Sequence, residues 1–365
     1  MQSRLSCGSF IALAFLVACG GNSSSAAAPR FWAVGGSETA SFPFGVVARS
    51  DDGGFEWHEI FTGSSPTGSA SAVAFVDREN GWVVAGEGIL HTTDGGDSFE
   101  LQNPNERCGG AAVASIDAHR AAVVGLVCQP SDFLCLRPIG CAIHTVDGGA
   151  HWLPSDTTRI AQGPINDVCF TSAGIGLAAA SGVPETADQP FPRVALSLDA
   201  GASWTAVQQE GVGGYRVACS GPRDLWAVAA SPRPRVWHSA DGGTTWTDLA
   251  EALAGSFPYL IDFVDSKNGW LIDGSEDSGR MPTVIHTRDA GNQWRVHPIR
   301  GDTGAGEEVE LDAEAFATAR SGVVVGLQFG MPNHPVAFAT KDGGSTWSEV
   351  YLPPGVRAVD VTGVP

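Results

Sequence analysis

One short pattern recurs seven times along the 365-residue chain and limits what the chain can fold into. Each copy has the form Ser/Thr-x-Asp-x-Gly-x-x-Trp/Phe, as in TTDGGDSF and TRDAGNQW. Steps of 42 to 53 residues separate the defining aspartates, which are Asp52, Asp94, Asp147, Asp199, Asp241, Asp289 and Asp342. Seven similar units at nearly even spacing indicate one repeat architecture rather than a set of unrelated domains.

The residue types of this motif predict a tight hairpin turn. Asp-Gly between two strands favours such a turn because glycine adopts positive φ at little cost. The carboxylate can accept backbone N–H groups of its own turn, the Ser or Thr hydroxyl can brace it, and the aromatic ring can pack on the hairpin. The motif resembles the BNR, or Asp-box, repeat. We expect all seven aspartates to be structural, because one catalytic centre does not need seven separated copies.

Apolar segments around each motif predict four short strands per repeat. The second repeat reads SAVAFVD, GWVVAG, GILHTTDGG and SFELQ, and the sixth reads YLIDFVD, GWLIDG, TVIHTRDAG and QWRVH. We name these strands A to D in chain order, so that the motif lies in the C–D hairpin. Seven such units predict an all-β fold, a seven-bladed β-propeller of four-stranded antiparallel blades.

The two ends of the folded region have the sequence patterns of two parts of one blade. The segment Phe31–Gly35 (FWAVG) has the pattern of a strand B, and its missing strand A is found in Val356–Val361 (VRAVDV). We therefore expect residues 31–365 to form a single propeller. Pairing of its N- and C-terminal strands closes the ring and removes an open sheet edge.

The first 30 residues have the features of a targeting segment and a tether. Phe10–Val17 is an apolar run too short for a permanent membrane span. The following Leu-Val-Ala-Cys-Gly resembles a bacterial lipobox, which predicts a signal peptide at 1–18, lipidation of Cys19 and a flexible tether at 19–30. A plain secretory signal is the alternative. We expect an exported lipoprotein held by membrane lipid in the bacterial envelope, at the outer membrane rather than the inner one, because Gly20 is not a retention aspartate.

Six cysteines remain after the signal peptide and Cys19, an even number that suggests disulfides outside the cytoplasm. Four of them lie within 34 residues, which predicts a local staple, but sequence alone leaves the connectivity open. A zinc site is the alternative, and the chain has no C-x-x-C pair to support it. The candidate disulfide residues are Cys108, Cys128, Cys135, Cys141, Cys169 and Cys219.

Charge and motif content narrow the function classes. The chain has 21 Lys and Arg against 40 Asp and Glu, a net charge of −19, which argues against nucleic acid as a partner because phosphate binding needs a basic footprint. Its sequence contains no H-E-x-x-H, G-x-S-x-G or Walker pattern. Four histidines three residues before a motif aspartate fall in different blades, so they cannot share an ion: His91, His144, His238 and His286. We expect no metal, no cofactor and a monomer.

The candidate binding site is the mouth of the central channel. Long insertions are nearly all B–C loops, which share one face of the ring with the starts of the A strands, and variable loops on a rigid scaffold are common binding sites. Alignment of the repeats places a mixture of carboxylates, Tyr and Arg at this mouth, suited to a polar ligand or a protein segment. A hydrated, self-paired lining is the alternative. The residues are Asn166, Asp167, Tyr215, Arg216, Tyr259, Asp262, Asp312, Glu314 and Arg357.

Several phrases resemble the photosystem II stability/assembly factor family: FWAVGG (Phe31–Gly36), NGWVVAGEGILHTTDGG (Asn80–Gly96) and DLWAV (Asp224–Val228). That resemblance implies a seven-bladed Asp-box propeller, lipidated in some members, that binds assembly intermediates of a membrane complex without catalysis. We therefore expect a non-enzymatic, lipid-anchored scaffold that binds another envelope protein. The partner, and any link to photosynthesis, are left open by the sequence.

A more distant resemblance, through the Asp boxes alone, is to the sialidases and other glycoside hydrolases. Sialidases have six blades, an arginine triad, a Tyr–Glu nucleophile pair and an acid/base aspartate. This chain lacks the usual F/Y-R-I-P start and has three tyrosines, Tyr215, Tyr259 and Tyr351. Glycoside hydrolysis or glycan binding is thus the alternative function, and a matched pair of carboxylates at the mouth would favour the enzyme.

Overall fold

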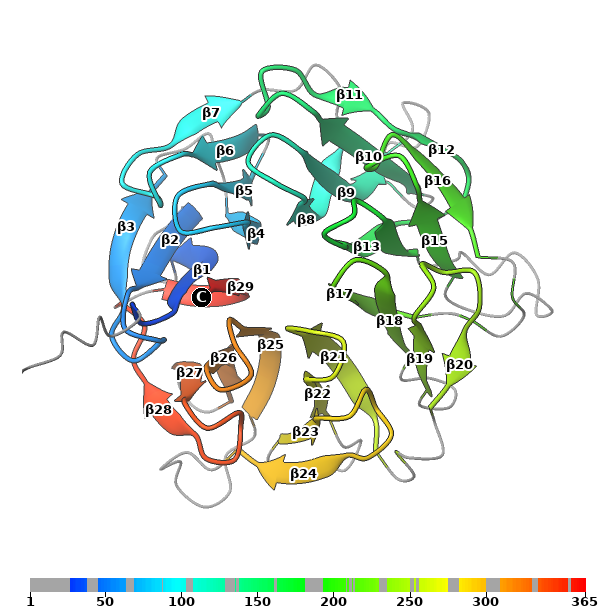
Figure 1. Cartoon of the computed structure of the whole chain (residues 1–365). Coiled ribbons are helices and arrows are strands. Elements are labelled where there is room, and N and C mark those ends of the chain that lie inside the picture. The colour runs from blue at the N-terminus through cyan, green and yellow to red at the C-terminus, as the bar shows by residue number, and fades with distance from the viewer. Residues whose placement is uncertain are drawn as a thin grey trace, which may run out of the picture.

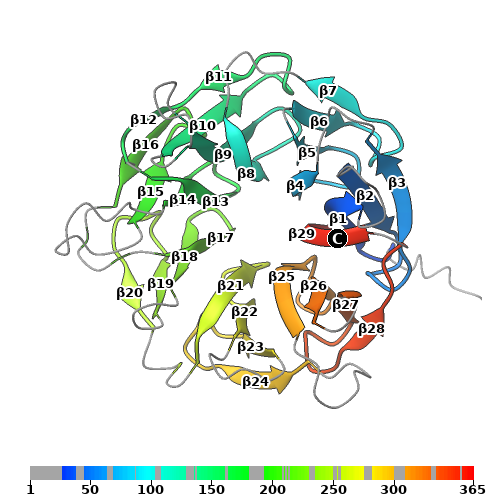
Figure 2. The same cartoon turned by 180° about the vertical axis from the view of Figure 1, so that it is seen from behind.

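The computed structural model describes residues 27–365 except 38–44, 64–68, 87, 103–107, 129–134, 136–137, 161–162, 181–192, 208, 210–211, 213, 230–234, 250–252, 254–255, 275–281, 300–308, 330–333 and 354–355. Seven sheets surround a central axis, as Figure 1 shows from one side and Figure 2 from the other. The predicted all-β, seven-bladed propeller is confirmed. The predicted signal peptide and Cys19 lie outside the described residues, as do most of the long B–C loops.

We number the blades from 1 to 7 along the chain and give their strands from the axis outward. Blade 1 contains β29 (Val356–Val364), β1 (Arg30–Ser37), β2 (Gly45–Ser50) and β3 (His58–Thr62), and blade 2 contains β4 (Ala70–Phe75), β5 (Gly81–Ala85), β6 (Gly88–Thr92) and β7 (Glu100–Gln102). Blade 3 contains β8 (Gly109–Ser115), β9 (Ala121–Val127), β10 (Ile139–Thr145) and β11 (Leu153–Pro154). Blade 4 contains β13 (Ile165–Phe170), β14 (Gly176–Ala180), β15 (Arg193–Ser197), β16 (Ser203–Ala206) and β12 (Asp156–Arg159). Blade 5 contains β17 (Arg216–Ser220), β18 (Asp224–Ala229), β19 (Arg235–Ser239) and β20 (Thr247–Asp248). Blade 6 contains β21 (Pro258–Phe263), β22 (Gly269–Asp273), β23 (Thr283–Thr287) and β24 (Arg295–Pro298). Blade 7 contains β25 (Val309–Phe316), β26 (Gly322–Gln328), β27 (His334–Thr340) and β28 (Ser348–Val350).

Blade 1 closes the ring with strands from both ends of the chain. β1 pairs antiparallel with β29 from Arg30 opposite Val364 to Ser37 opposite Val356. β29 is the innermost strand of the blade, as the red strand in Figure 1 shows. The predicted pairing of the termini is therefore confirmed, and the hydrogen bonds that an open blade would expose are used in closure.

Blade 4 differs from the expected four strands because it has a fifth. β12 runs parallel to the outermost strand β16 and pairs Asp156 with Ser203 and Arg159 with Thr205. The Asp156 N–H also donates to the Ala202 carbonyl at 2.9 Å. The short connection from blade 3 thus covers the edge of the next blade, a pairing that the repeat pattern could not reveal because β12 belongs to no repeat.

The Gly-Trp step of the repeat is explained by packing between blades. Trp270 of β22 stacks on Phe316 of blade 7, with ring centroids 3.7 Å apart and planes 3° apart. Phe316 in turn lies over Gly322, where an added Cβ would meet the ring at 2.3 Å. The same arrangement pairs Trp32 with Phe75 and Trp226 with Phe263. The glycine is required for space, and the Trp joins neighbouring blades through stacked aromatic faces.

All seven Asp boxes form the same hydrogen-bonded turn. In each box the Ser or Thr hydroxyl donates to the Asp Oδ1 at 2.8–3.0 Å and accepts the N–H of the glycine two positions beyond the Asp. The same Oδ1 accepts the N–H four residues further on at 2.8–2.9 Å. Hydrogen bonds from Ser98 lower the pKa of Asp94 to about 2. These carboxylates serve as turn acceptors at the rim.

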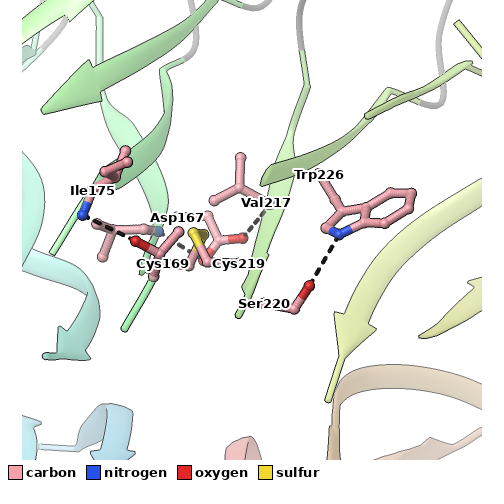
Figure 3. The surroundings of a disulfide bond; sticks show 9 residues. Asp167, Cys169, Ile175, Val217, Cys219, Ser220 and Trp226 are labelled. Carbon is pink, nitrogen blue, oxygen red and sulfur yellow. Dashed lines mark hydrogen bonds between the residues drawn. A yellow bond between two sulfur atoms is a disulfide. The ribbon is translucent and has the colours of Figure 1, made fainter. Parts of the chain in front are cut away.

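Three disulfides connect the six cysteines. Cys108–Cys141 lies within blade 3 and Cys128–Cys135 follows β9, so the predicted local staple between residues 108 and 141 is confirmed. The third disulfide, Cys169–Cys219, joins the innermost strands of blades 4 and 5 (Figure 3). In the described part of the chain no set of His, Cys, Asp or Glu side chains is arranged to hold a metal ion. No helix there is long and apolar enough for a membrane span.

Candidate functional site

The candidate site is a cavity of about 270 Å³ at the mouth of the central channel. Strands A from all seven blades line it, so the site is shared around the ring. Five predicted residues line the cavity: Asn166, Asp167, Arg216, Asp312 and Glu314. The other four do not line it and lie nearby on the same strands or next to them: Tyr215, Tyr259, Asp262 and Arg357.

A β-bulge near the start of strand A aims side chains at this mouth. In six blades the pairing of strand A with strand B passes over one residue. Five of the residues passed over line the cavity, namely Ser71, Ala111, Asn166, Asp312 and Val359. A bulge re-aims a side chain that a regular strand would point into the sheet interface, and here it repeats around the ring.

Three aspartates of the innermost strands bind the backbone of the following blade. Asp360 Oδ2 accepts the Val73 N–H at 2.8 Å, Asp167 Oδ2 accepts the Val217 N–H at 2.8 Å, and Asp262 Oδ2 accepts the Phe316 N–H at 2.6 Å. Figure 3 shows the Asp167 bond beside the disulfide that joins the same two strands. These aspartates therefore act as braces between blades, and their oxygens are occupied.

Burial raises the pKa of all three brace aspartates. It raises the pKa of Asp360 to about 7 and that of Asp262 to about 6, although backbone N–H groups oppose the shift in both cases. Burial also raises the pKa of Asp167, against the nearby Arg216 guanidinium. Burial thus holds the pKa of these three carboxyl groups above the usual range of an aspartate.

Asp312 and Glu314 differ from the braces because each has a buried oxygen without a partner. No hydrogen-bond donor in the described structure reaches Asp312 Oδ2 or Glu314 Oε1. Burial, and after it the neighbouring Asp262 carboxylate, raise the pKa of Glu314 well above its usual range. Burial also raises the pKa of Asp312, and Arg357 opposes that shift.

The remaining predicted residues have different surroundings. Arg216 is the cavity's guanidinium, and it donates to the Tyr215 carbonyl at 3.5 Å. Tyr259 packs against Gly274, and burial raises the pKa of its hydroxyl. Arg357 is exposed on β29. The mouth therefore contains more carboxylates than cations.

Two polar lining residues were missed from the sequence, Ser71 and Asp360. Asp360 occupies the position in β29 that Asp167 occupies in β13, directly after the residue that the pairing with strand B passes over. The signal was present, because Val-Asp-Val of the last strand aligns with Asn-Asp-Val of the fourth blade. Ser71 carried no such signal, since only its bulge brings it to the mouth.

The four repeated histidines lie in different blades, on β6, β10, β19 and β23. Three stack on the Trp of the neighbouring strand B within their own blade: His91 on Trp82, His238 on Trp226 and His286 on Trp270. Larger hollows lie at the outer rim. One of about 680 Å³ is between blades 2 and 3, and one of about 500 Å³ is between blades 4 and 5.

Comparison with known proteins shows similarity in structure. No protein-family model and no curated protein matches the sequence. A structure titled YCF48 bound to D1 peptide superposes with a TM-score of 0.51 at 18% identity, covering 78% of this chain and 82% of that one. YCF48 from Cyanidioschyzon merolae gives 0.50 at 17% identity, covering 77% and 84%. A GH74 enzyme from Niastella koreensis gives 0.30 at 13% identity, covering 84% and 74%.

At these identities the similarity concerns the fold alone. It agrees with the seven-bladed architecture. The resemblance to photosystem II assembly factors, expected from the sequence, is confirmed at this level by the two YCF48 structures. The chain is a seven-bladed β-propeller similar in fold to YCF48.

Proposed function

We propose that this protein is a non-enzymatic propeller that binds a segment of another envelope protein at its channel mouth. The observation that carries the proposal is the bulged ring of strand A residues, which presents polar side chains from many blades around one cavity. A rigid ring of this kind suits recognition of a chain segment better than chemistry at one bond. The YCF48 structure bound to a D1 peptide supports peptide binding by a similar fold.

The state of the channel carboxylates also favours binding over hydrolysis. A two-carboxylate glycosidase needs two acids about 5–10 Å apart with oxygens available to substrate or water. Asp167, Asp262 and Asp360 use their carboxylates on backbone N–H groups of the next blade. Converting any of them into a catalytic acid would remove a contact between blades.

Glycoside hydrolysis is the second candidate, and one observation favours it. Asp262 and Glu314 lie close enough for Asp262 to raise the pKa of Glu314, an arrangement that enzymes use to keep one carboxyl protonated. A panel of aryl glycosides tests this candidate. Turnover by the wild type that is abolished in Glu314→Gln would establish the enzyme.

The partner can be identified by photo-crosslinking in the native envelope. Val359 lines the cavity and Val296 is 59% exposed on the outermost strand of blade 6, so benzoylphenylalanine placed at either position samples the mouth or the rim. We expect one envelope protein to be captured from position 359 and not from position 296. Equal capture from both positions, or none from 359, would contradict binding at the mouth.

We also propose that lipid on Cys19 anchors the protein in the envelope, close to a membrane-complex partner whose assembly or stability it supports. The LVACG sequence supports this proposal. Cys19→Ala should release the protein from washed membranes and abolish incorporation of labelled fatty acid. A variant that stays with the membrane and is processed normally would refute lipid anchoring.

A further inference from the structure

We propose that the channel mouth binds an alkylammonium group, a lysine side chain of the partner segment, between Asp312 and Glu314. This inference rests on the proposed function and specifies the chemical group that the mouth recognises. It begins with the two buried oxygens, Asp312 Oδ2 and Glu314 Oε1, that have no donor within the described structure. Buried polar atoms without a partner are uncommon and costly, and a bound group is one way to satisfy them.

These two residues are the carboxylates of the wall that are free to take a ligand. Asp167 and Asp360 also line the cavity, but each already accepts a backbone N–H from the next blade. No ion pair of the described structure joins Asp312 or Glu314 to an arginine. In the described structure Asp312 and Glu314 therefore have no cation at contact distance.

Part of the wall suits the stem of a lysine. The exposed apolar side chains of Ala111 and Val359 border the cavity, whereas Val73, Val113, Val217 and Ile261 are buried in the packing between blades. A lysine buries its methylene stem along apolar surface and places its ammonium on polar acceptors. The volume of about 270 Å³ fits a side chain and is at or below the range of sites that hold drug-sized ligands.

An inorganic cation fits this wall poorly. A calcium ion needs six to eight oxygen ligands, and magnesium needs near-octahedral geometry. The described residues contain no set of three or more acidic, His or Cys side chains arranged for a metal. Two carboxyl oxygens without a partner in the described structure are instead matched to the three donors of one ammonium group.

The test uses the folded protein and two peptides that differ by one charge. The probes are acetyl-Gly-Gly-Lys-Gly-Gly-amide and the same peptide with Nε-acetyllysine. Binding is followed by isothermal titration and by NMR shifts of the cavity residues. We expect millimolar binding of the lysine peptide, and binding at least about tenfold weaker for the acetylated one, which corresponds to 1.4 kcal/mol.

Isosteric variants assign the effect to the two carboxylates. The double variant Asp312→Asn, Glu314→Gln should lose binding of the lysine peptide by about tenfold or more. Glu100→Gln, which removes an exposed carboxylate from the outermost strand of blade 2, is the matched control and should bind as the wild type does. If the double variant fails to fold, the single Asp312→Asn variant and competition by n-butylammonium provide the same comparison. Equal binding of both peptides, no binding of either, or unchanged binding by the variants would overturn the proposal.

Failure of this inference can be distinguished from failure of the proposed function. Capture of the same partner from position 359 in the wild type and in the Asp312→Asn, Glu314→Gln variant would preserve mouth binding and refute the lysine site. Specific binding of the lysine peptide without capture of any partner would establish the site and refute the proposed function.

Discussion

Two contacts between blades do the same work with different chemistry. We call the contact between blades 6 and 7 seam 6/7, and that between blades 4 and 5 seam 4/5. Both have an aspartate brace, Asp262 to the Phe316 N–H and Asp167 to the Val217 N–H. Beyond the brace, seam 6/7 is held by Trp270 stacked on Phe316, whereas seam 4/5 is held by the Cys169–Cys219 disulfide.

The pairing of strand A with strand B explains why seam 4/5 has a disulfide where seam 6/7 has stacked rings. Phe316 pairs with Gly322, the first residue of its strand B, and Cys219 pairs with Leu225 at the corresponding place in blade 5. A ring needs glycine opposite it, while a cysteine leaves room for a leucine. Blade 4 likewise has Leu177 where blade 6 has Trp270. Seam 4/5, which lacks the stacked rings, is joined covalently, and the two seams should respond to different perturbations.

The largest loss of stability is expected when the tryptophan side chain of seam 6/7 is removed. Trp270 is fully buried, stacks on Phe316 and donates from Nε1 to the Gly343 carbonyl at 3.0 Å. Trp270→Ala should lower the free energy of unfolding by about 3–5 kcal/mol, since it leaves a cavity and an unpaired carbonyl. Denaturant unfolding measures the loss, and Tyr351→Ala at an 82% exposed side chain is the control. A cost below about 1 kcal/mol would show that the stack is not what holds this seam.

The next largest loss of stability is expected when the disulfide of seam 4/5 is removed. Cys169→Ala with Cys219→Ala opens a bridge between residues 50 apart in sequence, with an expected cost of about 2–4 kcal/mol. Cys128→Ala with Cys135→Ala opens a bridge between residues 7 apart and should cost less, because a short loop restrains the unfolded chain less. Unfolding with and without a dithiol reductant measures both. Equal losses from the two pairs would contradict a special role for the bridge between blades.

A smaller loss of stability is expected when the space that the Phe316 ring needs in seam 6/7 is filled. An added Cβ at Gly322 would lie 2.3 Å from the Phe316 ring, so Gly322→Ala forces the ring out of its stack. We expect a cost of about 1–3 kcal/mol. In a Phe316→Ala background the same change should cost little, which a double-mutant cycle measures directly. Additive costs would mean that Gly322 is needed for its backbone and not for the ring.

The sequence predicted the scaffold well because the repeat is visible in local chemistry. The Asp boxes, the four strands per blade and the closing strand all follow from residue types at fixed spacing. The mouth was predicted only in part, because a bulge in strand A decides which side chains point inward. Ser71 enters the cavity through its bulge, and Asp360 was overlooked although it is aligned with Asp167. The Cys169–Cys219 pairing depends on which blades are neighbours at the axis, which cysteine spacing does not encode.

The smallest expected effect is on how stability depends on pH, and it arises from one histidine that seam 6/7 has and seam 4/5 lacks. His286 stacks on Trp270, whereas Leu196 takes the corresponding position opposite Leu177 in blade 4. Burial, followed by the charges of Arg288, His297 and Arg295, lowers the pKa of His286 to about 4 from 6.5. As pH falls from 6.5 towards 4, the unfolded chain binds a proton that the folded chain refuses, so stability present above 6.5 is lost through this window.

His286→Leu copies blade 4 and should flatten the dependence of the free energy of unfolding on pH between 6.5 and 4, relative to the wild type. Asp262 and Asp360, whose pKa values are raised to about 6 and about 7, contribute the opposite slope, because the folded chain holds those protons more tightly. That contribution is present in both proteins and cancels in their difference. Denaturant unfolding across this pH range measures the difference, and NMR titration of the His286 ring checks its cause. Parallel curves for the two proteins would show that the histidine stack adds no pH sensitivity, and that the two seams differ in their response to reduction alone.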